Sequence, residues 1–437
     1  MKRPSIALIC SLVLSAAACG SGTTTQSVGT GGASGAAVVG TAGTTGNYAG
    51  TGGDPDIGAS GGTAGGAAAA GSGGQTEGGA AGQGLAGNGG LAGNGGSSAA
   101  GGAGGAAGTA GVGGSETELI HYYGRWNRLT DRAITVNTGS HVVAAFTGTA
   151  LSARFDVSTN QAPNPTLAWR IDQGDWQEGE LVADVSLATG LASGTHEVLL
   201  MVRGFNEYQS RWTQPLISSI SFLGFDVTGG VVQPSPRPAR SKIEFLGDSI
   251  TEGLYIWTTH NGQTTIPWCA DARRSWASQT AQSLGAEWRQ VGFGGQGLLK
   301  GGSSGVPPAN DTFNWIYKGV PRDAWQADVV VINQGTNDGG ASATDFRPAY
   351  ATFIGTVRAG YPTAKIVAMR PFNGAHAAEI QAEVSARHAA GDARIFFVDT
   401  TGWLGNGDFT DGTHLNDQGS PKAATALTAA LHSLGVL

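Results

Sequence analysis

The chain has 437 residues, of which 74 are glycine, and its formal net charge is −7 at neutral pH. A mildly acidic chain without a basic run lacks the electrostatic footprint of a nucleic-acid-binding protein, so we expect no nucleic-acid partner. No apolar stretch of about 20 residues follows the N-terminal segment, and the pattern therefore predicts no membrane-spanning helix.

The first 19 residues have the pattern of an export signal. Residues 1–3 are basic, residues 6–14 form a short apolar run, and small residues precede Cys19. This arrangement resembles a bacterial lipobox, in which the cysteine is lipidated and becomes the first residue of the mature protein. The alternative is an ordinary secretory peptide cleaved nearby. Both readings predict an exported protein, either a cell-envelope lipoprotein or a secreted one, with membrane contact only through a lipid at Cys19.

Residues 20–115 form a segment of extreme composition. They hold 38 of the 74 glycines, only three charged residues and almost no large apolar side chains. Such a segment cannot bury enough surface to offset the conformational entropy lost on ordering. We therefore predict a disordered Gly/Ala/Ser/Thr-rich linker that tethers the rest of the chain.

Residues 116–235 show short runs in which apolar and polar residues alternate. Such runs, separated by Gly, Asn, Asp and Thr, predict an all-β sandwich. The residues of 171–176 favour a hairpin with an Asp/Gly turn. Three prolines between residues 234 and 238 mark the end of this domain. The predicted strands are 133–136, 141–147, 151–157, 167–172 and 197–202.

From residue 240 to the end of the chain, strand-like runs alternate with helix-like ones. This alternation predicts a parallel sheet covered by helices, in which functional residues gather at the carboxyl ends of the strands. The predicted strands are 242–246, 328–333, 364–369 and 395–398. The predicted helices are 275–284, 345–359, 375–390 and 420–434.

Two of these strands lead into residues with catalytic chemistry. Gly247-Asp248-Ser249 follows the first strand, where a glycine permits a tight turn that exposes the serine hydroxyl. Asp411 lies three residues before His414, beyond the last strand. A carboxylate at that spacing can hold one ring nitrogen while the other nitrogen accepts a proton from serine.

A glycine-rich loop and an amide follow two further strands. Residues 292–297 read Gly-Phe-Gly-Gly-Gln-Gly, which also fits a dinucleotide-binding fingerprint. That fingerprint must open a helix, whereas residues 298–308 are rich in Gly, Ser and Pro. The better interpretation is a loop whose N–H groups face a developing anion, with the Asn337 amide as a further donor.

These blocks resemble those of the SGNH (GDSL-type) hydrolases, because Gly247-Asp248-Ser249, Gly295, Asn337 and the Asp411–His414 pair stand in the same order. The preceding segment narrows the resemblance to carbohydrate esterase family 2 with its N-terminal jelly roll. The resemblance covers about residues 120–437. It implies a flavodoxin-like three-layer α/β/α domain over residues 240–437, with a parallel sheet, preceded by a jelly-roll sandwich over residues 116–235. The segments that carry the family 2 resemblance are 124–126, 146–149, 170–174, 194–198 and 327–338.

The resemblance implies a role for each matching residue. Ser249 corresponds to the nucleophile, His414 to the general base and Asp411 to the acid that orients it. The oxyanion hole corresponds to the N–H groups of Ser249 and Gly295 and to the Asn337 side chain. No cofactor and no metal are implied. Whether Asp411 is required stays open, because some family members work without this acid.

The implied reaction is removal of O-acetyl groups from an acetylated polysaccharide such as xylan or another plant hemicellulose. One alternative is an esterase or lipase of the same fold that acts on small acyl or lipid esters. The other is a non-catalytic carbohydrate-binding lipoprotein. Trp257, Trp315 and Trp403 are candidates for a sugar-binding platform, and the alternative for each of them is core packing.

Overall fold

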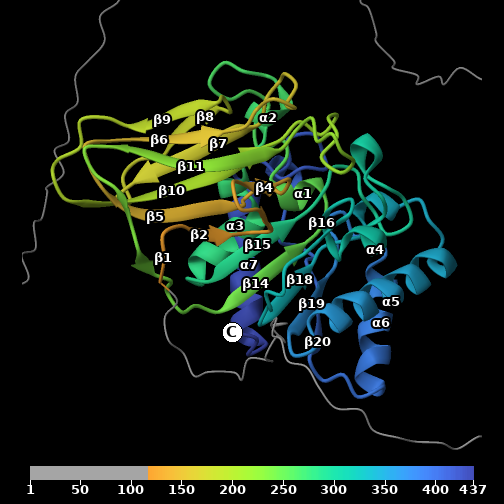
Figure 1. The fold of residues 1–437 in the computed structure, drawn as a ribbon. Helices are drawn as coiled ribbons and strands as arrows, with labels where there is room; N and C mark the ends of the chain where they lie inside the picture. Colours follow the sequence, from red (N-terminus) through yellow and green to blue (C-terminus); the bar gives the residue numbers. More distant parts are fainter. Residues whose placement is uncertain (1–116) are drawn as a thin grey trace, which may run out of the picture. The chain divides into compact units, whose positions relative to one another are not determined.

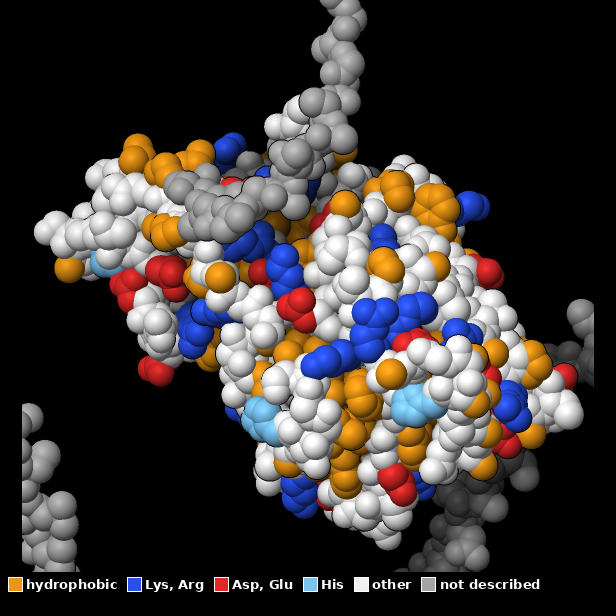
Figure 2. Space-filling view, turned by 90° about the horizontal axis from the view of Figure 1, so that it is seen from below, with side chains coloured by type: hydrophobic (Ala, Val, Ile, Leu, Met, Phe, Trp, Pro, Cys, Tyr) orange, Lys and Arg blue, Asp and Glu red, His pale blue; other side chains and the backbone are white. Residues whose placement is uncertain are grey.

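The computed structural model describes residues 117–437. The predicted export signal, the lipidation candidate Cys19 and the predicted linker lie outside these residues. Within residues 117–437, no helix combines the length and the apolar character needed to cross a membrane. Figure 2 shows one face of the structure, on which Lys and Arg side chains lie among Asp and Glu side chains.

The first part of the described chain is all-β, as predicted. Two antiparallel sheets enclose a core built from the inward-facing residues of both, including Phe146, Phe155 and Phe222. Strand β1 (Thr117–Glu118) pairs with β13 (Ser235–Pro236) outside these sheets. One sheet contains β2 (His121–Tyr123), β5 (His141–Thr147), β7 (Thr166–Ile171), β8 (Gln177–Glu180), β10 (Thr195–Gly204) and β12 (Val232–Gln233). The other contains β3 (Asn127–Arg128), β4 (Ala133–Thr135), β6 (Ala150–Phe155), β9 (Asp184–Ala188) and β11 (Ile220–Thr228).

The predicted hairpin connects β7 and β8. Asp172 and Gln173 have φ values of 52° and 60°, and the Gly174 N–H donates to the Ile171 carbonyl. A turn with two consecutive positive φ values matches the right-handed twist of paired strands, which is why it closes short hairpins.

The second part holds a five-stranded parallel sheet with helices, which confirms the predicted α/β class. The strand order is β15-β14-β18-β19-β20, so the chain starts inside the sheet and extends it first to one side and then to the other. A small hairpin of β16 (Trp315–Tyr317) and β17 (Val320–Pro321) lies apart from this sheet. The parallel strands are β14 (Lys242–Leu246), β15 (Glu287–Val291), β18 (Val329–Ile332), β19 (Lys365–Met369) and β20 (Ile395–Val398).

Helices cover both faces of the parallel sheet. Val329 and Val331 of β18 pack in one core cluster with α3 and α7, whereas Val330 and Ile332 pack in another with α5 and α6. Figure 1 shows α5 and α6 lying side by side. A strand buried on both faces must be apolar throughout, which explains the continuous apolar run of β18. The helices are α1 (Ser249–Glu252), α2 (Ile266–Cys269), α3 (Trp276–Ser283), α4 (Ala309–Thr312), α5 (Ala343–Gly360), α6 (Ala377–Ala389) and α7 (Gly419–Ser433).

Buried polar contacts join the two parts. The Arg125 guanidinium donates to both carboxylate oxygens of Glu244 on β14, at 3.0 and 3.1 Å, and both side chains are fully buried. Burial alone would raise the pKa of Glu244, but the charge of Arg125 lowers it below its usual value. Glu244 therefore stays charged, and loss of either partner would leave an unpaired charge in the interior.

The domain division at residues 116, 235 and 240 stays a prediction.

Candidate active site

Ser249 lies directly after strand β14, at the start of helix α1. The Asp248 side chain caps this helix by accepting the Ile250 N–H at 3.0 Å. Gly247 fits where no other residue would, because an added Cβ would come within 2.0 Å of the Thr251 hydroxyl oxygen. The Gly-Asp-Ser sequence therefore forms a tight turn that places the serine at the carboxyl edge of the sheet.

The structure brings Ser249, His414 and Asp411 together. The Ser249 hydroxyl lies 2.9 Å from His414 Nε2, and Asp411 Oδ2 lies 2.8 Å from His414 Nδ1. Asp411 Oδ1 also accepts the backbone N–H groups of Thr413 and His414. Because the carboxylate accepts from Nδ1, this ring nitrogen carries the proton and Nε2 is free to accept the serine proton.

Asp411 retains its negative charge in this arrangement. Burial alone would raise the pKa of Asp411, but the hydrogen bonds from the His414 backbone and ring lower it below its usual value. The carboxylate can therefore stabilise an imidazolium that forms when the serine loses its proton.

The three predicted oxyanion donors lie in neighbouring segments. Asn337 Nδ2 donates to Asp248 Oδ2 and to the Gln296 carbonyl, both at 3.0 Å. These two acceptors directly precede Ser249 and follow Gly295 in the chain. Within residues 117–437, neither the Ser249 N–H nor the Gly295 N–H donates to a protein acceptor. Two backbone donors are thus available to an incoming anion, whereas Asn337 must release or share one of its present acceptors.

The glycine-rich segment is a loop and not the start of a helix, which agrees with the interpretation drawn from the sequence. Asp338 holds it by accepting the N–H groups of Leu298 and Leu299 at 2.8 and 3.0 Å. An added Cβ at Gly297 would lie 2.3 Å from the Asp338 carboxylate. Gly295 has a φ of +69°, a conformation that favours glycine.

Asp248 is a site residue whose state the sequence does not indicate. Its carboxyl is fully buried, and burial raises its pKa to about 7, with the nearby Asp338 charge acting in the same direction. Below that pH, Asp248 is neutral in the folded protein and competes less strongly for the Asn337 amide.

The raised pKa predicts a pH-dependent stability. Between about pH 4 and pH 7, the unfolded chain has lost the Asp248 proton while the folded protein keeps it, so stability falls as the pH rises through this window. The full effect is about 4 kcal/mol by linkage. Urea unfolding at pH 4.5–7.5 should show that the free energy of unfolding of Asp248→Asn increases relative to that of the wild type as the pH rises. Parallel curves for the two proteins would contradict the prediction.

The three predicted tryptophans do not form one surface. The Trp257 ring stacks on His260 with centroids 5.2 Å apart, and Trp403 packs beside the core cluster of α3 and α7. Trp315 is 38% exposed, but its carbonyl accepts from buried Arg125 and its strand belongs to a separate small hairpin. Their role in binding sugar stays a prediction.

The sequence analysis did not single out Tyr255, which lies next to His414, or Tyr208, which lies in the connection between β10 and β11. The Tyr255 ring meets the His414 ring edge to face, with centroids 5.2 Å apart. Burial raises the pKa of Tyr255. Tyr208 directly follows Glu207, whose carboxylate accepts the Gly294 N–H of the glycine-rich loop. Tyr208 is 75% exposed. Neither residue belongs to a motif, so only the folded chain reveals their position.

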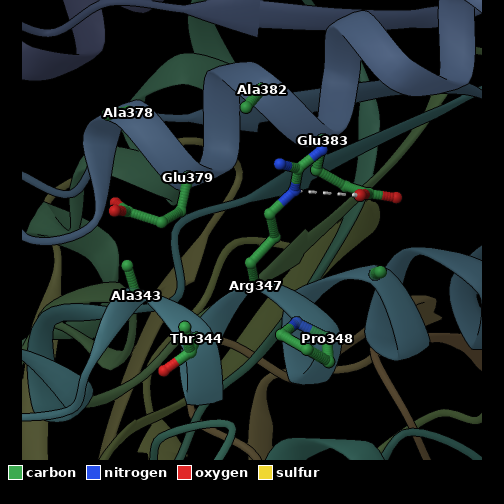
Figure 3. A pocket seen from close by; sticks show the side chains of 9 residues that line it. Ala343, Thr344, Arg347, Pro348, Ala378, Glu379, Ala382 and Glu383 are labelled. Atoms are coloured by element: carbon green, nitrogen blue, oxygen red, sulfur yellow. Dashed lines mark ion pairs between the residues drawn. The ribbon is translucent and has the colours of Figure 1, made fainter.

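A groove of about 610 Å³ between α5 and α6 contains none of the predicted site residues. Figure 3 shows Arg347 of α5 facing Glu383 of α6 across it, with a shortest nitrogen–oxygen distance of 4.0 Å. Among residues 117–437, no three His, Cys, Asp or Glu side chains gather as metal ligands would.

A hydrogen-bonded serine, histidine and aspartate at the carboxyl edge of a doubly wound parallel sheet is the arrangement of serine-dependent acyl hydrolases. Residues 245–420 match the model of the GDSL-like Lipase/Acylhydrolase family. The resemblance inferred from the sequence blocks is thereby confirmed.

Curated relatives and solved structures agree with this family. The chain is 36% identical over 191 residues to a cellulase/esterase, CelE, of Acetivibrio thermocellus, which covers 42% of this chain. It is 27% identical over 186 residues, or 40% of this chain, to an acetylxylan esterase / glucomannan deacetylase of Cellvibrio japonicus. These matches span only 22% and 49% of the relatives' own lengths.

A family two carbohydrate esterase from Clostridium thermocellum, solved in complex with cellohexaose, has the same fold. Its TM-score to this structure is 0.63, its sequence identity is 28%, and the match covers 73% of this chain and 100% of that chain. The predicted combination of an all-β part followed by an SGNH-type α/β part is therefore confirmed.

Proposed function

We propose that the protein is a serine esterase that removes O-acetyl groups from a polysaccharide such as acetylated xylan or another plant hemicellulose. The observation that carries the proposal is the hydrogen-bonded chain from Ser249 through His414 to Asp411, beside backbone N–H groups without protein acceptors. The substrate class is supported by two similar proteins, an acetylxylan esterase / glucomannan deacetylase and a family two carbohydrate esterase solved with cellohexaose.

In the proposed reaction, the Ser249 oxygen attacks the acetyl carbonyl while His414 Nε2 takes the hydroxyl proton. The negative oxygen that forms is stabilised by the N–H groups of Ser249 and Gly295 and by the Asn337 amide, each worth about 3–4 kcal/mol in the transition state. The bond between the acetyl carbon and the sugar oxygen then breaks, and His414 gives its proton to that oxygen, which leaves as a sugar hydroxyl and leaves the acetyl group on Ser249. Water, activated by the same imidazole, releases acetate from Ser249.

The sugar ring needs an apolar face beside the serine. The exposed ring of Tyr208 and the ring of Tyr255 next to His414 suit such stacking, because aromatic side chains combine apolar area with a polar tip. We include both tyrosines in the proposed substrate-binding surface, together with Trp257. Export of the protein, with or without a lipid at Cys19, belongs to the same proposal.

The experiment that tests this function measures acetate release by the full-length protein. We expect release from acetylated xylan and acetylated glucomannan, and hydrolysis of 4-nitrophenyl acetate with a kcat/KM at least about 100-fold above that for the palmitate ester, because a long chain needs an extended apolar site.

Two other outcomes would contradict the proposal. Preference for the palmitate ester would identify a lipase. Binding of cellohexaose or xylan without any ester cleavage would identify a non-catalytic carbohydrate-binding protein.

A further inference from the structure

Two charged residues of the all-β part reach the candidate active site. Glu207 and Arg211 lie in the connection between β10 and β11, and both are buried. Arg211 Nη2 donates to Glu207 Oε1 at 2.8 Å, and Arg211 Nη1 donates to Glu252 Oε1 at 2.6 Å. Glu252 is the last residue of helix α1, one turn after Ser249. The guanidinium thus connects the all-β part to the helix that begins with the serine.

The second oxygen of Glu207 holds the glycine-rich loop. Glu207 Oε2 accepts the Gly294 N–H at 2.6 Å, and Gly294 directly precedes Gly295. An added Cβ at Gly294 would lie 2.1 Å from the same oxygen, so this close approach requires glycine. The Ser304 hydroxyl donates to the Glu207 carbonyl, which fixes the returning side of the loop.

The cluster is electrically balanced despite containing two carboxyl groups. Burial and the adjacent Glu207 carboxylate raise the pKa of Glu252 well above its usual value. If Glu252 were ionised, its buried Oε2 would have no hydrogen-bond donor. Protonation of Glu252 turns this oxygen from an acceptor without a donor into a hydrogen-bond donor, and it leaves one negative carboxylate fewer beside Arg211.

We propose that Glu207 and Arg211 are positioning residues that hold the Gly294–Gly295 segment against helix α1, so that the Ser249 and Gly295 N–H groups point to one oxyanion. This inference rests on the proposed function. It gives the all-β part a direct role in the chemistry, because the residues that align the oxyanion donors belong to that part. Alignment matters because donors act in the transition state only when they are already in place.

Glu207→Gln tests most directly whether Glu207 must hold both the Gly294 N–H and Arg211. Glutamine has one acceptor oxygen and one NH₂ group, so it can satisfy the Gly294 N–H or Arg211, but not both. We expect kcat for 4-nitrophenyl acetate to fall about 10- to 100-fold while KM changes less than about threefold, because the oxyanion donors act on the transition state. Amide hydrogen exchange at residues 294–295 should accelerate at least about tenfold.

A second variant separates the loop contact from the charge. Glu207→Asp keeps the negative charge that Arg211 needs but withdraws the carboxylate by one methylene from the Gly294 N–H. We expect a similar fall in kcat with a smaller loss of thermal stability, so the inference stays testable if the glutamine variant folds poorly.

The chain offers a matched control in helix α6. Glu383 precedes Arg387 by four residues, as Glu207 precedes Arg211, and the shortest ion-pair distance is again 2.8 Å. Glu383 is also buried, and it lies at the groove drawn in Figure 3, outside the site. Glu383→Gln should lower the thermal midpoint without changing kcat or the exchange of residues 294–295.

The outcomes distinguish this inference from the proposed function. The inference alone would be overturned if the wild type is active and the Glu207 variants match Glu383→Gln both in kcat and in amide hydrogen exchange at residues 294–295. A wild type inactive on every ester would overturn the proposed function and this inference together.

Discussion

Replacement of Ser249 by alanine is expected to lower kcat for acetate release by about 10⁴- to 10⁶-fold, the range typical for loss of a nucleophile that acts with a base. The Ser249 oxygen is the atom that His414 Nε2 contacts at 2.9 Å, and no other hydroxyl contacts that nitrogen within residues 117–437. The measurement is acetate released from acetylated xylan and 4-nitrophenol released from its acetate ester.

The Ser249→Ala variant should fold normally, because alanine fits helix α1 and the Asp248 cap uses the Ile250 backbone. Thermal unfolding checks this point. Ser385→Ala is the matched control, since Ser385 is an exposed helical serine of α6. It should retain full activity, and turnover by Ser249→Ala within tenfold of the wild type would eliminate the proposed mechanism.

His414→Ala is expected to lose as much activity as Ser249→Ala, and the double variant should be no worse than either single one. Serine and histidine act as one unit, so removing the second adds nothing once the first is gone. Single-turnover and steady-state rates on the acetate ester measure this. His432→Ala, an exposed histidine near the end of α7, serves as the control.

Asp411→Asn should cost less than His414→Ala, about 10²- to 10⁴-fold, because it disturbs the ring tautomer but leaves the base in place. The Thr413 and His414 N–H groups can still bond to the asparagine oxygen, so the loop geometry survives. An Asp411→Asn variant with wild-type kcat would show that His414 works without its acid.

A double variant of Ser249 and His414 that is far less active than each single variant would contradict the prediction that serine and histidine act as one unit.

The sequence alone predicted most regular elements of the parallel-sheet part. Strand 395–398 matches β20, and the helix predicted at 420–434 corresponds to α7 at Gly419–Ser433. These segments have apolar patterns of the right period, so local sequence carries the signal. Strand β11 (Ile220–Thr228) was missed, and its pairing is interrupted by an irregularity between Phe222 and Gly224. A bulge shifts the alternation on which strand prediction depends.

For the candidate site, the sequence determined which residue types follow which strands: the Gly-Asp-Ser turn, the amide at Asn337 and the Asp411–His414 pair. Only the tertiary structure decided that Glu207 and Arg211 of the all-β part contact Gly294 and Glu252, that Asp248 holds the Asn337 amide, and that Tyr255 lies beside His414. The physical reason is that turns and periodic faces depend on neighbours in the chain. Contacts between residues far apart in sequence depend instead on how the helices and strands pack against one another. Such contacts produce no periodic pattern in the sequence from which they could be predicted.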